Sequence, residues 1–132
     1  MIRIAIDAMG GDRAPEEIIR GAAEAREKYQ ITLVGPGFLR ESIPKGMKLV
    51  EASEWIEMDE SPAIALRRKK DSSLMVAAKL VRDGKADALI SAGNSGATMG
   101  AALLSLGRIP GISRPAIAIP LPTVTKDPCL IL

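Results

Sequence analysis

The sequence predicts an α/β domain with a doubly wound, mostly parallel sheet. Apolar runs of strand length alternate along the chain with helical patterns, which is the order expected when crossover helices join parallel strands. One Trp, one Tyr and one Phe among 132 residues leave Ile, Leu, Val, Ala and Met to form the core. That composition suits helices packed on a parallel sheet. Two of the apolar runs end in glycine-rich loops, at residues 7–12 and 91–97.

Five elements are expected in the first half of the chain: a strand at 2–6, a helix from Pro15, a strand at 31–34, a short helix at 38–42 and a strand at 48–52. The first strand follows from its alternating pattern. The helix follows from Pro15 at the first helical position and from Glu16 and Glu17 in the first turn, where negative charge suits the helix dipole. Its apolar face is expected to carry Ile18, Ala22, Ala25 and Tyr29.

Five further elements are expected in the second half: a short helix from Pro62 through Arg67, a helix at about 74–83, a strand at 88–90, a helix at 97–106 and a strand at 114–119. Ser61 is the expected N-cap of the first of these helices, and Ser72 and Ser73 can cap the second. Gly84 and Gly107 stand where helices commonly end on a glycine.

The last apolar run, residues 128–132, indicates the start of a buried strand, and a domain seldom ends on exposed aliphatic residues. We therefore expect residues 1–132 to form a single α/β unit that is the N-terminal part of a longer enzyme, or half of a site that another chain completes. Cys129 lies in this run and is interpreted as an inert, buried thiol.

Composition excludes several classes of function. A net charge of +2 and so few aromatic residues disfavour nucleic-acid binding. The absence of histidine rules out a Ser-His-Asp or Cys-His nucleophile and a histidine zinc site within this chain, and a single cysteine rules out an internal disulfide. No metal and no cofactor are expected. We find no signal peptide and no apolar run of membrane-spanning length, so a cytoplasmic protein is expected.

The second glycine-rich loop is the best candidate anion site. The helix expected after Asp12 already carries acidic residues in its first turn, whereas the helix that begins near Asn94 carries none. This stretch offers the amide of Asn94, the hydroxyls of Ser95 and Thr98, and glycines that permit close approach; its residues are Gly93, Asn94, Ser95, Gly96, Ala97 and Thr98. The alternative is a tight strand-to-helix turn whose glycines only permit packing.

Two other groups could contribute to a site. Four consecutive cations begin at Arg67 and end at Lys70, just before the hydroxyls of Ser72 and Ser73. They could attract phosphate or an acidic partner, although a solvated charge run with an ordinary serine cap would look the same. In the first loop, Asp7 and Asp12 flank Gly10 and Gly11. These carboxylates could bind a metal or a substrate, or could simply tie down their own loop.

Four motifs occur in order and at natural spacing, at residues 6–12, 65–73, 91–97 and 114–116. Together they resemble the acyl-acyl-carrier-protein:phosphate acyltransferase family of bacterial phospholipid synthesis, and the resemblance covers the whole chain. Ser95 stands where that family usually has Thr, which keeps the hydroxyl. The resemblance implies a fold similar to that of phosphotransacetylases and isopropylmalate dehydrogenases. It also implies homodimers well over twice this length, which are cytoplasmic and associate with the membrane surface.

The resemblance implies transfer of a fatty acyl group from the acyl carrier protein to inorganic phosphate, giving acyl phosphate. Asn94 and Lys70 are then the expected catalytic residues. Phosphate or substrate binding is expected from Gly93, Ser95, Gly96, Ala97, Arg67, Ser72 and Ser73, and from Asp7, Gly10, Gly11 and Asp12 in the first loop. Two alternatives stay open: a coenzyme A-dependent phosphate acetyl- or butyryltransferase, and a non-catalytic module that binds acyl carrier protein. A dehydrogenase is disfavoured because no dinucleotide fingerprint is present.

Overall fold

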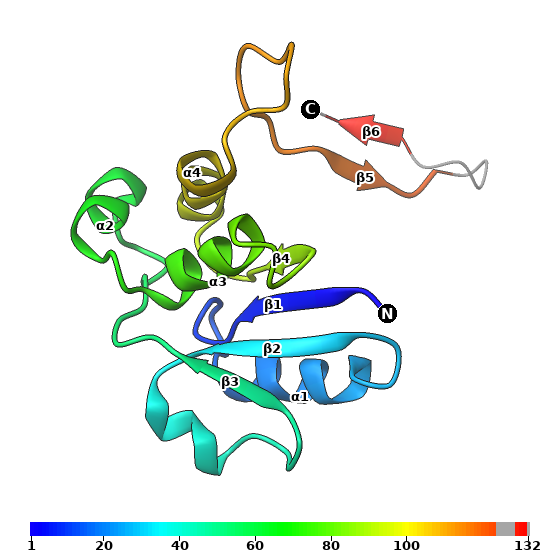
Figure 1. Cartoon of the computed structure of the whole chain (residues 1–132). Coiled ribbons are helices and arrows are strands. Elements are labelled where there is room, and N and C mark those ends of the chain that lie inside the picture. The colour runs from blue at the N-terminus through cyan, green and yellow to red at the C-terminus, as the bar shows by residue number, and fades with distance from the viewer. Residues whose placement is uncertain (124–128, 132) are drawn as a thin grey trace.

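A four-stranded parallel sheet, in the order β3-β2-β1-β4, forms the centre of the protein (Figure 1). The computed structural model describes residues 1–123 and 129–131. The strands of this sheet are β1 (Arg3–Asp7), β2 (Gln30–Gly35), β3 (Lys48–Glu51) and β4 (Ala88–Ile90). The α-helices are α1 (Glu16–Ala25), α2 (Pro62–Arg68), α3 (Ser73–Arg82) and α4 (Ser95–Leu106), and η1 (Gly37–Glu41) is a 3₁₀ helix. The predicted α/β class and parallel sheet are confirmed.

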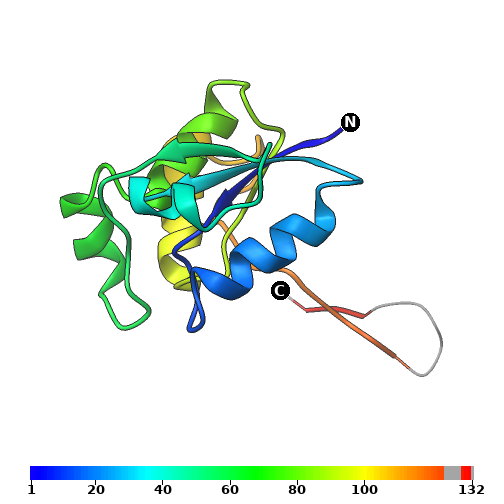
Figure 2. The same ribbon diagram turned by 90° about the horizontal axis from the view of Figure 1, so that it is seen from below.

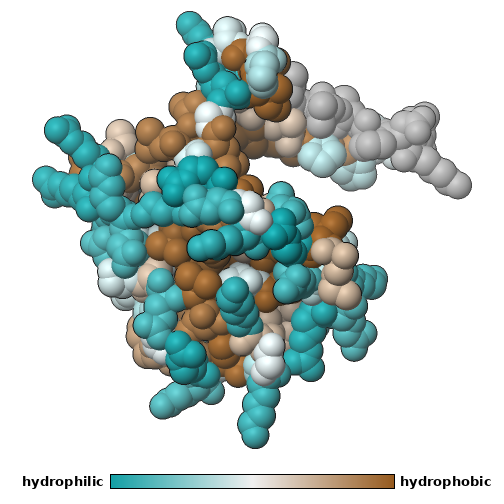
Figure 3. Space-filling view, in the orientation of Figure 1, coloured by the Kyte–Doolittle hydropathy of each residue, from teal (hydrophilic) through white to brown (hydrophobic). Residues whose placement is uncertain are grey.

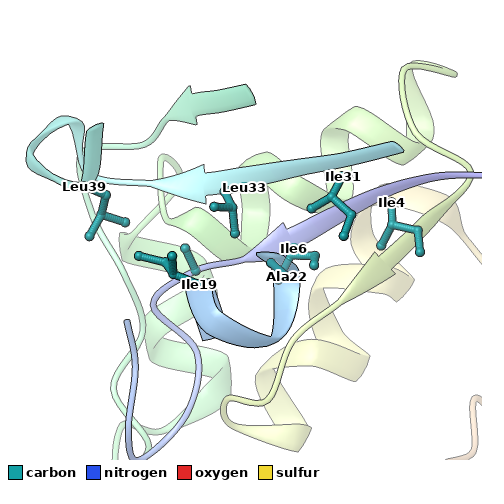
Figure 4. Packing of buried hydrophobic residues seen from close by; sticks show 8 residues of the cluster. Ile4, Ile6, Ile19, Ala22, Ile31, Leu33 and Leu39 are labelled. Atoms are coloured by element: carbon teal, nitrogen blue, oxygen red, sulfur yellow. The ribbon is translucent and has the colours of Figure 1, made fainter. Parts of the chain in front are cut away.

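Helices cover both faces of the sheet, as the doubly wound arrangement requires (Figure 2). Alternate residues of β1 face opposite sides, because successive side chains of a strand point to opposite faces. Ile4 and Ile6 pack with Ile19 and Ala22 of α1 (Figure 4). On the other face Ala5 packs in a cluster that α3 completes.

The local helix signals agree closely with the structure. Ser61 is the N-cap of α2, Ser72 is the N-cap of α3, and Gly84 and Gly107 adopt the positive φ values of 66° and 78° just after α3 and α4. At α1 the agreement is off by one residue, since Pro15 is the N-cap and Glu16 begins the helix.

Three of the four residues expected on the apolar face of α1 contact the core: Ala22 is buried, and Ile18 and Ala25 pack against it partly buried. Ile19, which was not expected there, is also buried, whereas Tyr29 lies beyond the helix and is 37% exposed. The helix is too short to carry Tyr29 on its face, because it ends at Ala25.

The amino ends of β1 and β4 are joined by an ion pair. The Arg3 guanidinium donates to both carboxylate oxygens of Asp87 and to the carbonyl oxygen of Gly84, and the Arg3 backbone N–H donates to Asp87 Oδ2 at 2.8 Å. These hydrogen bonds lower the pKa of Asp87 to about 2. This clamp lies at the edge of the sheet opposite the glycine-rich loops.

The prediction of a strand at 114–119 is wrong. Strand β5 (Ile119–Leu121) begins only at the last of those residues, and it pairs antiparallel with β6 (Cys129–Ile131) in a separate two-stranded sheet. Pro115 cannot donate a ladder hydrogen bond, and Pro120 is tolerated because β5 is an edge strand. The strand expected near the end of the sequence is present at Cys129–Ile131, but the burial of Cys129 lies outside the side chains that the structure describes.

Candidate functional site at the carboxyl edge of the sheet

The parallel register brings the two glycine-rich loops together. Ile6 of β1 is paired with Ile90 of β4, so the residues that follow, Asp7 and Ser91, leave the sheet side by side. Both loops therefore begin at the carboxyl edge, which is where ligands bind in open α/β sheets.

Asp7 joins three segments that are distant in the sequence. Asp7 is only 4% exposed, and its carboxylate accepts hydrogen bonds from Ser73 Oγ at 2.6 Å and from Ser91 Oγ at 2.8 Å. It also accepts from the Met9 backbone N–H at 3.2 Å. Ser91 Oγ in turn accepts from the Gly93 N–H at 3.1 Å. The carboxylate thus holds the first loop, the start of α3 and the second loop in one arrangement.

The glycines of the two loops allow the loops to touch. A Cβ atom on Gly10 would lie 2.6 Å from Asp7 Oδ2 and from Ser91 Oγ, and 3.0 Å from the Gly93 nitrogen. Gly11 adopts a φ of 126°, and a Cβ there would lie 3.3 Å from the carbonyl oxygen of Ala92. Loop-to-loop contact therefore requires these glycines, whether or not a ligand also approaches them.

Both the oxygen and the nitrogen of the Asn94 side-chain amide are hydrogen-bonded within the protein. Its Oδ1 accepts from the Ala97 N–H at 3.0 Å and so caps α4. Its Nδ2 donates to the carbonyl oxygens of Met58 and Glu60 at 3.1 and 3.0 Å. Asn94 therefore positions the start of α4 rather than offering a free amide. With Ala97 capped, the N–H groups of Ser95 and Gly96 are those that helix geometry directs out of the helix end.

Gly96 also serves the packing of α4 on α2. A Cβ on Gly96 would lie 2.9 Å from Pro62 Cγ, and a Cβ on Gly100, one helical turn later, would lie 2.5 Å from Leu66 Cδ1. Two glycines four residues apart thus let α2 approach α4 closely. This packing fixes the direction in which the first turn of α4 points.

Ser72 and Ser73 are 0% and 1% exposed, and the hydroxyl group of each is hydrogen-bonded to another group of the protein. Ser72 Oγ accepts from the Met75 N–H at the cap of α3, and Ser73 Oγ donates to Asp7. These two side chains therefore hold the start of α3 and Asp7 in place, and they do not line the site. Asp12, by contrast, is exposed at the tip of the first loop.

The basic cluster divides into exposed and committed members. Arg67 and Lys70 are exposed, whereas Lys69 is partly buried, donates to the Trp55 carbonyl oxygen at 2.8 Å and forms an ion pair with Glu60. A hydrogen bond from the Glu57 backbone, together with Lys69, lowers the pKa of Glu60. The Glu60 carbonyl oxygen also accepts from Asn94, the N-cap of α4. By fixing Glu60, Lys69 therefore helps to hold the start of α4 in place.

A cavity of about 870 Å³ opens beside the second loop. One wall consists of the loop and α4, including Ser91, Gly93, Ser95 and Thr98, and the other is formed by residues 107–109, 112 and 114–117. Two arginines, Arg108 and Arg114, belong to this second wall.

Four residues around this site received no individual role in the sequence analysis: Ser91, Lys69, Arg108 and Arg114. Arg114 opens one of the four motifs noted above, and Ser91 is the first residue of the second loop, so both carried a signal. Lys69 and Arg108 carried none that distinguishes them from surface cations. Within residues 1–123 and 129–131, no three His, Cys, Asp or Glu side chains are grouped so as to hold a metal ion. No helix of that part of the chain is long and apolar enough to span a membrane.

The comparisons with known proteins agree with one another. The sequence model of a family described as "Fatty acid synthesis protein" matches residues 2–132. The chain is 54% identical over 139 positions to a phosphate acyltransferase of Desulfitobacterium hafniense (strain Y51), covering 99% of this chain and 42% of that protein. It is 56% identical over 140 positions to the phosphate acyltransferase of Heliobacterium modesticaldum, covering 98% and 42%. It is 51% identical to that of Trichodesmium erythraeum, covering 98% and 41%. The chain thus spans about two fifths of the length of the curated relatives it matches.

Proposed function

The chain belongs to the family of fatty acid synthesis proteins, and we propose that it carries the phosphate-binding part of a phosphate acyltransferase. The reaction proposed is the transfer of a fatty acyl group from the thioester of acyl carrier protein to inorganic phosphate. Its product, an acyl phosphate, would supply phospholipid synthesis. Acyl carrier protein and inorganic phosphate are the partners that this proposal requires.

One observation carries the proposal: a helix start without acidic residues is held by hydrogen bonds at the carboxyl edge of the sheet and lines a cavity. Asn94 fixes the first turn of α4, and the Asp7–Ser91 bonds fix the loop before it. The cavity beside this turn is lined by Ser95 together with Arg108 and Arg114. Backbone N–H groups at a helix start and guanidinium groups are the donors that phosphate oxygens prefer.

This chemistry needs no histidine. An oxygen of phosphate attacks the thioester carbonyl carbon, the tetrahedral intermediate collapses, and the carbon–sulfur bond breaks to release the carrier thiolate, which takes a proton from solvent. Phosphate is itself the nucleophile, so the protein has to hold it and stabilise charge on the carbonyl oxygen. We assign the phosphate to the N–H groups of Ser95 and Gly96, with Arg114 of the cavity lining as the cation that balances its charge.

The other predicted site residues take positioning or docking roles in this proposal. Asn94 acts by orienting the helix start, and Asp7 with Ser73 holds the loops. The exposed Arg67 and Lys70 lie at the end of α2 and just beyond it, where they can attract an acidic carrier protein or balance the charge of phosphate. These cations are the observation that favours the second candidate, a module that binds the carrier protein without catalysis.

The phosphate assignment can be tested by removing one N–H group. Ser95 is the first residue of α4, where proline is tolerated, and Asn94 before it has an extended ψ of 113° that is compatible with a following proline. Ser95→Pro should therefore keep the helix and lose the donor. In millimolar phosphate the unchanged chain should unfold at a higher temperature than without phosphate, as linkage requires, and Ser95→Pro should lose most of that shift. Ser95→Ala keeps the N–H group and is the matched control.

Turnover separates the remaining alternatives. The assay follows phosphate-dependent release of the carrier thiol from acyl-acyl carrier protein, with acyl-coenzyme A as the second substrate. Loss of one such donor should lower the rate by roughly 10²–10³-fold in Ser95→Pro. Equal phosphate response and equal turnover in Ser95→Pro and Ser95→Ala would contradict the assignment. Carrier binding that weakens with salt but never gives phosphate-dependent thiol release would favour the non-catalytic module.

A further inference from the structure

We propose that the cavity beside α4 is the binding site for the acyl chain, with the reacting end of the acyl group at the second glycine-rich loop. The inference rests on the proposed function, and it adds the site and the residues that would select the chain. Leu103 and Met99 of α4 are the residues expected to contact the chain first.

The cavity has a polar end and an apolar end. At the polar end lie Ser91, Gly93 and Ser95, where the phosphate is assigned. Further along α4 the lining becomes aliphatic, with Met99 and Leu103 on the helix and Ile112 and Ile117 on the facing segment. This change of character follows the helix axis, because Ser95, Met99 and Leu103 are four residues apart and lie along one face of α4.

Several of the aliphatic residues that line the cavity are substantially exposed. Met99 is 36% exposed, Leu103 38%, Ile112 51% and Ile117 49%. Figure 3 shows hydrophobic residues gathered over α4 and at the base of the segment that follows it, and Figure 1 shows that segment looping away from the helix and returning toward β5. A contiguous apolar surface of this kind usually marks a binding site.

Size and charge favour an amphiphile with one anionic end. A cavity of about 870 Å³ falls in the range that encloses small organic ligands. The N–H groups of the first turn of α4 and the hydroxyls of Ser91 and Ser95 lie at one end of it, and most of the remaining lining is apolar. Arg114 also lines the cavity, whereas Arg108 follows the opposite end of α4 and donates to the carbonyl oxygen of Ser113. A fatty acyl group that ends in phosphate matches this arrangement at both ends. An apolar protein segment would fill the aliphatic part and leave the N–H groups at the start of α4 without an anion.

Alkyl phosphates of increasing chain length are suitable probes, because they carry the head and the chain but cannot transfer an acyl group. Butyl, hexyl and octyl phosphate are titrated below their micelle concentrations, with inorganic phosphate measured separately. Each buried CH₂ should tighten binding about fourfold. Octyl phosphate should therefore bind roughly 10²-fold more tightly than butyl phosphate if its four extra groups are buried.

Two neighbouring leucines provide a matched pair of variants. Leu103 lines the cavity, whereas Leu104, 66% exposed on the same helix, is not among the residues that line it in the described part of the chain. Leu103→Asn should flatten the dependence on chain length and leave the affinity for inorganic phosphate unchanged, while Leu104→Asn should change neither. Met99→Gln is a second lining variant, should Leu103→Asn fail to fold as judged by circular dichroism.

The outcomes separate this inference from the proposed function. If inorganic phosphate binds but butyl and octyl phosphate bind equally, the acyl-chain site is wrong and the phosphate site stands. If chain length matters but Leu103→Asn and Leu104→Asn respond alike, the chain binds elsewhere and the inference is overturned. If chain-length dependence is lost only in the lining variants while inorganic phosphate never binds, the chain site is supported and the phosphate assignment fails.

Discussion

Replacing Asp7 by alanine should destabilise the fold substantially, although Asp7 is a charged residue at the end of β1, next to a loop. The carboxylate accepts from Ser73 Oγ at 2.6 Å and from Ser91 Oγ at 2.8 Å, and it is almost fully buried. In Asp7→Ala both hydroxyls lose their acceptor. Ser73 is only 1% exposed, so water cannot easily replace the lost partner.

The expected loss can be built from these two contacts. Leaving the buried Ser73 hydroxyl unsatisfied should cost about 1–3 kcal/mol. Ser91 is half-buried and can turn toward water, so its contribution should be nearer ~1 kcal/mol. The free energy of unfolding should therefore fall by about 2–4 kcal/mol, out of the ~5–15 kcal/mol typical of a domain. For a chain of this size that corresponds to a fall in Tm on the order of 10 °C.

Asp7→Asn separates the hydrogen bonds from the charge. The asparagine oxygen can still accept from Ser73, and its NH₂ group can donate to Ser91 Oγ, which has a second lone pair beside the one used by Gly93. We therefore expect about half the loss seen in Asp7→Ala. Asp12→Ala is the control, because Asp12 is exposed in the same loop and its removal should change stability by less than ~0.5 kcal/mol.

Urea denaturation followed by circular dichroism provides the free energies, and a double-mutant cycle with Ser91→Ala measures the coupling between the two residues. A coupling of roughly 1 kcal/mol or more is expected for groups in direct contact within one network. The reasoning would be refuted if Asp7→Ala unfolded within 1 kcal/mol of the unchanged protein, or no earlier than Asp12→Ala. Either result would mean that the loops are held together by something other than this carboxylate.

Three further predictions concern other parts of the fold. Gly10→Ala should lower the free energy of unfolding by ~1–3 kcal/mol, because its Cβ would lie 2.6 Å from two oxygens. Gly21→Ala is the control: this helical residue has open space around it, so the free energy of unfolding should rise by up to ~1 kcal/mol. Urea denaturation that ranked the two variants the other way would contradict the packing described. Hydrogen bonds from Arg3 lower the pKa of Asp87 to about 2, so this carboxylate stabilises the fold above pH 3.8 and loses that effect as the pH falls through 2; the stability difference between the protein and Asp87→Asn should shrink over that interval, and a constant difference would exclude the linkage. Ser72→Ala removes the cap of α3 and should cost ~0.5–2 kcal/mol in the same assay, and an unchanged free energy of unfolding would mean that the cap does not stabilise α3.

The placing of elements could be predicted well where the signals are local. Ser61 with Pro62, and Gly84 with Gly107, mark helix ends through the conformation of one or two residues, and the structure follows them. The strand at 114–119 failed for the opposite reason. A short apolar run forms a strand only if a neighbouring strand accepts its hydrogen bonds, and no local pattern states which neighbour is present.

The roles of the site residues could be predicted much less well. Asn94 and Ser73 were identified from their chemistry, but the structure shows their polar atoms bound to Glu60, Ala97 and Asp7. Hydrogen bonds that join different segments link residues far apart in the chain: Asn94 and Glu60 are 34 residues apart, and Ser91 and Asp7 are 84 residues apart. Composition and motif spacing contain no information about such pairs.

The α/β class, the order of strands and helices, the family and the two loops at which a site was expected could all be predicted from the amino-acid sequence. Those properties depend on periodicity, capping and motif order, all of which are local along the chain. Three features became evident only from the folded structure: Gly10 and Gly93 let the loops touch, Asp7 holds them there, and Arg114 lines the same cavity as Ser95. Each of these depends on the parallel register and on helix packing, which bring residues from distant parts of the chain within contact distance.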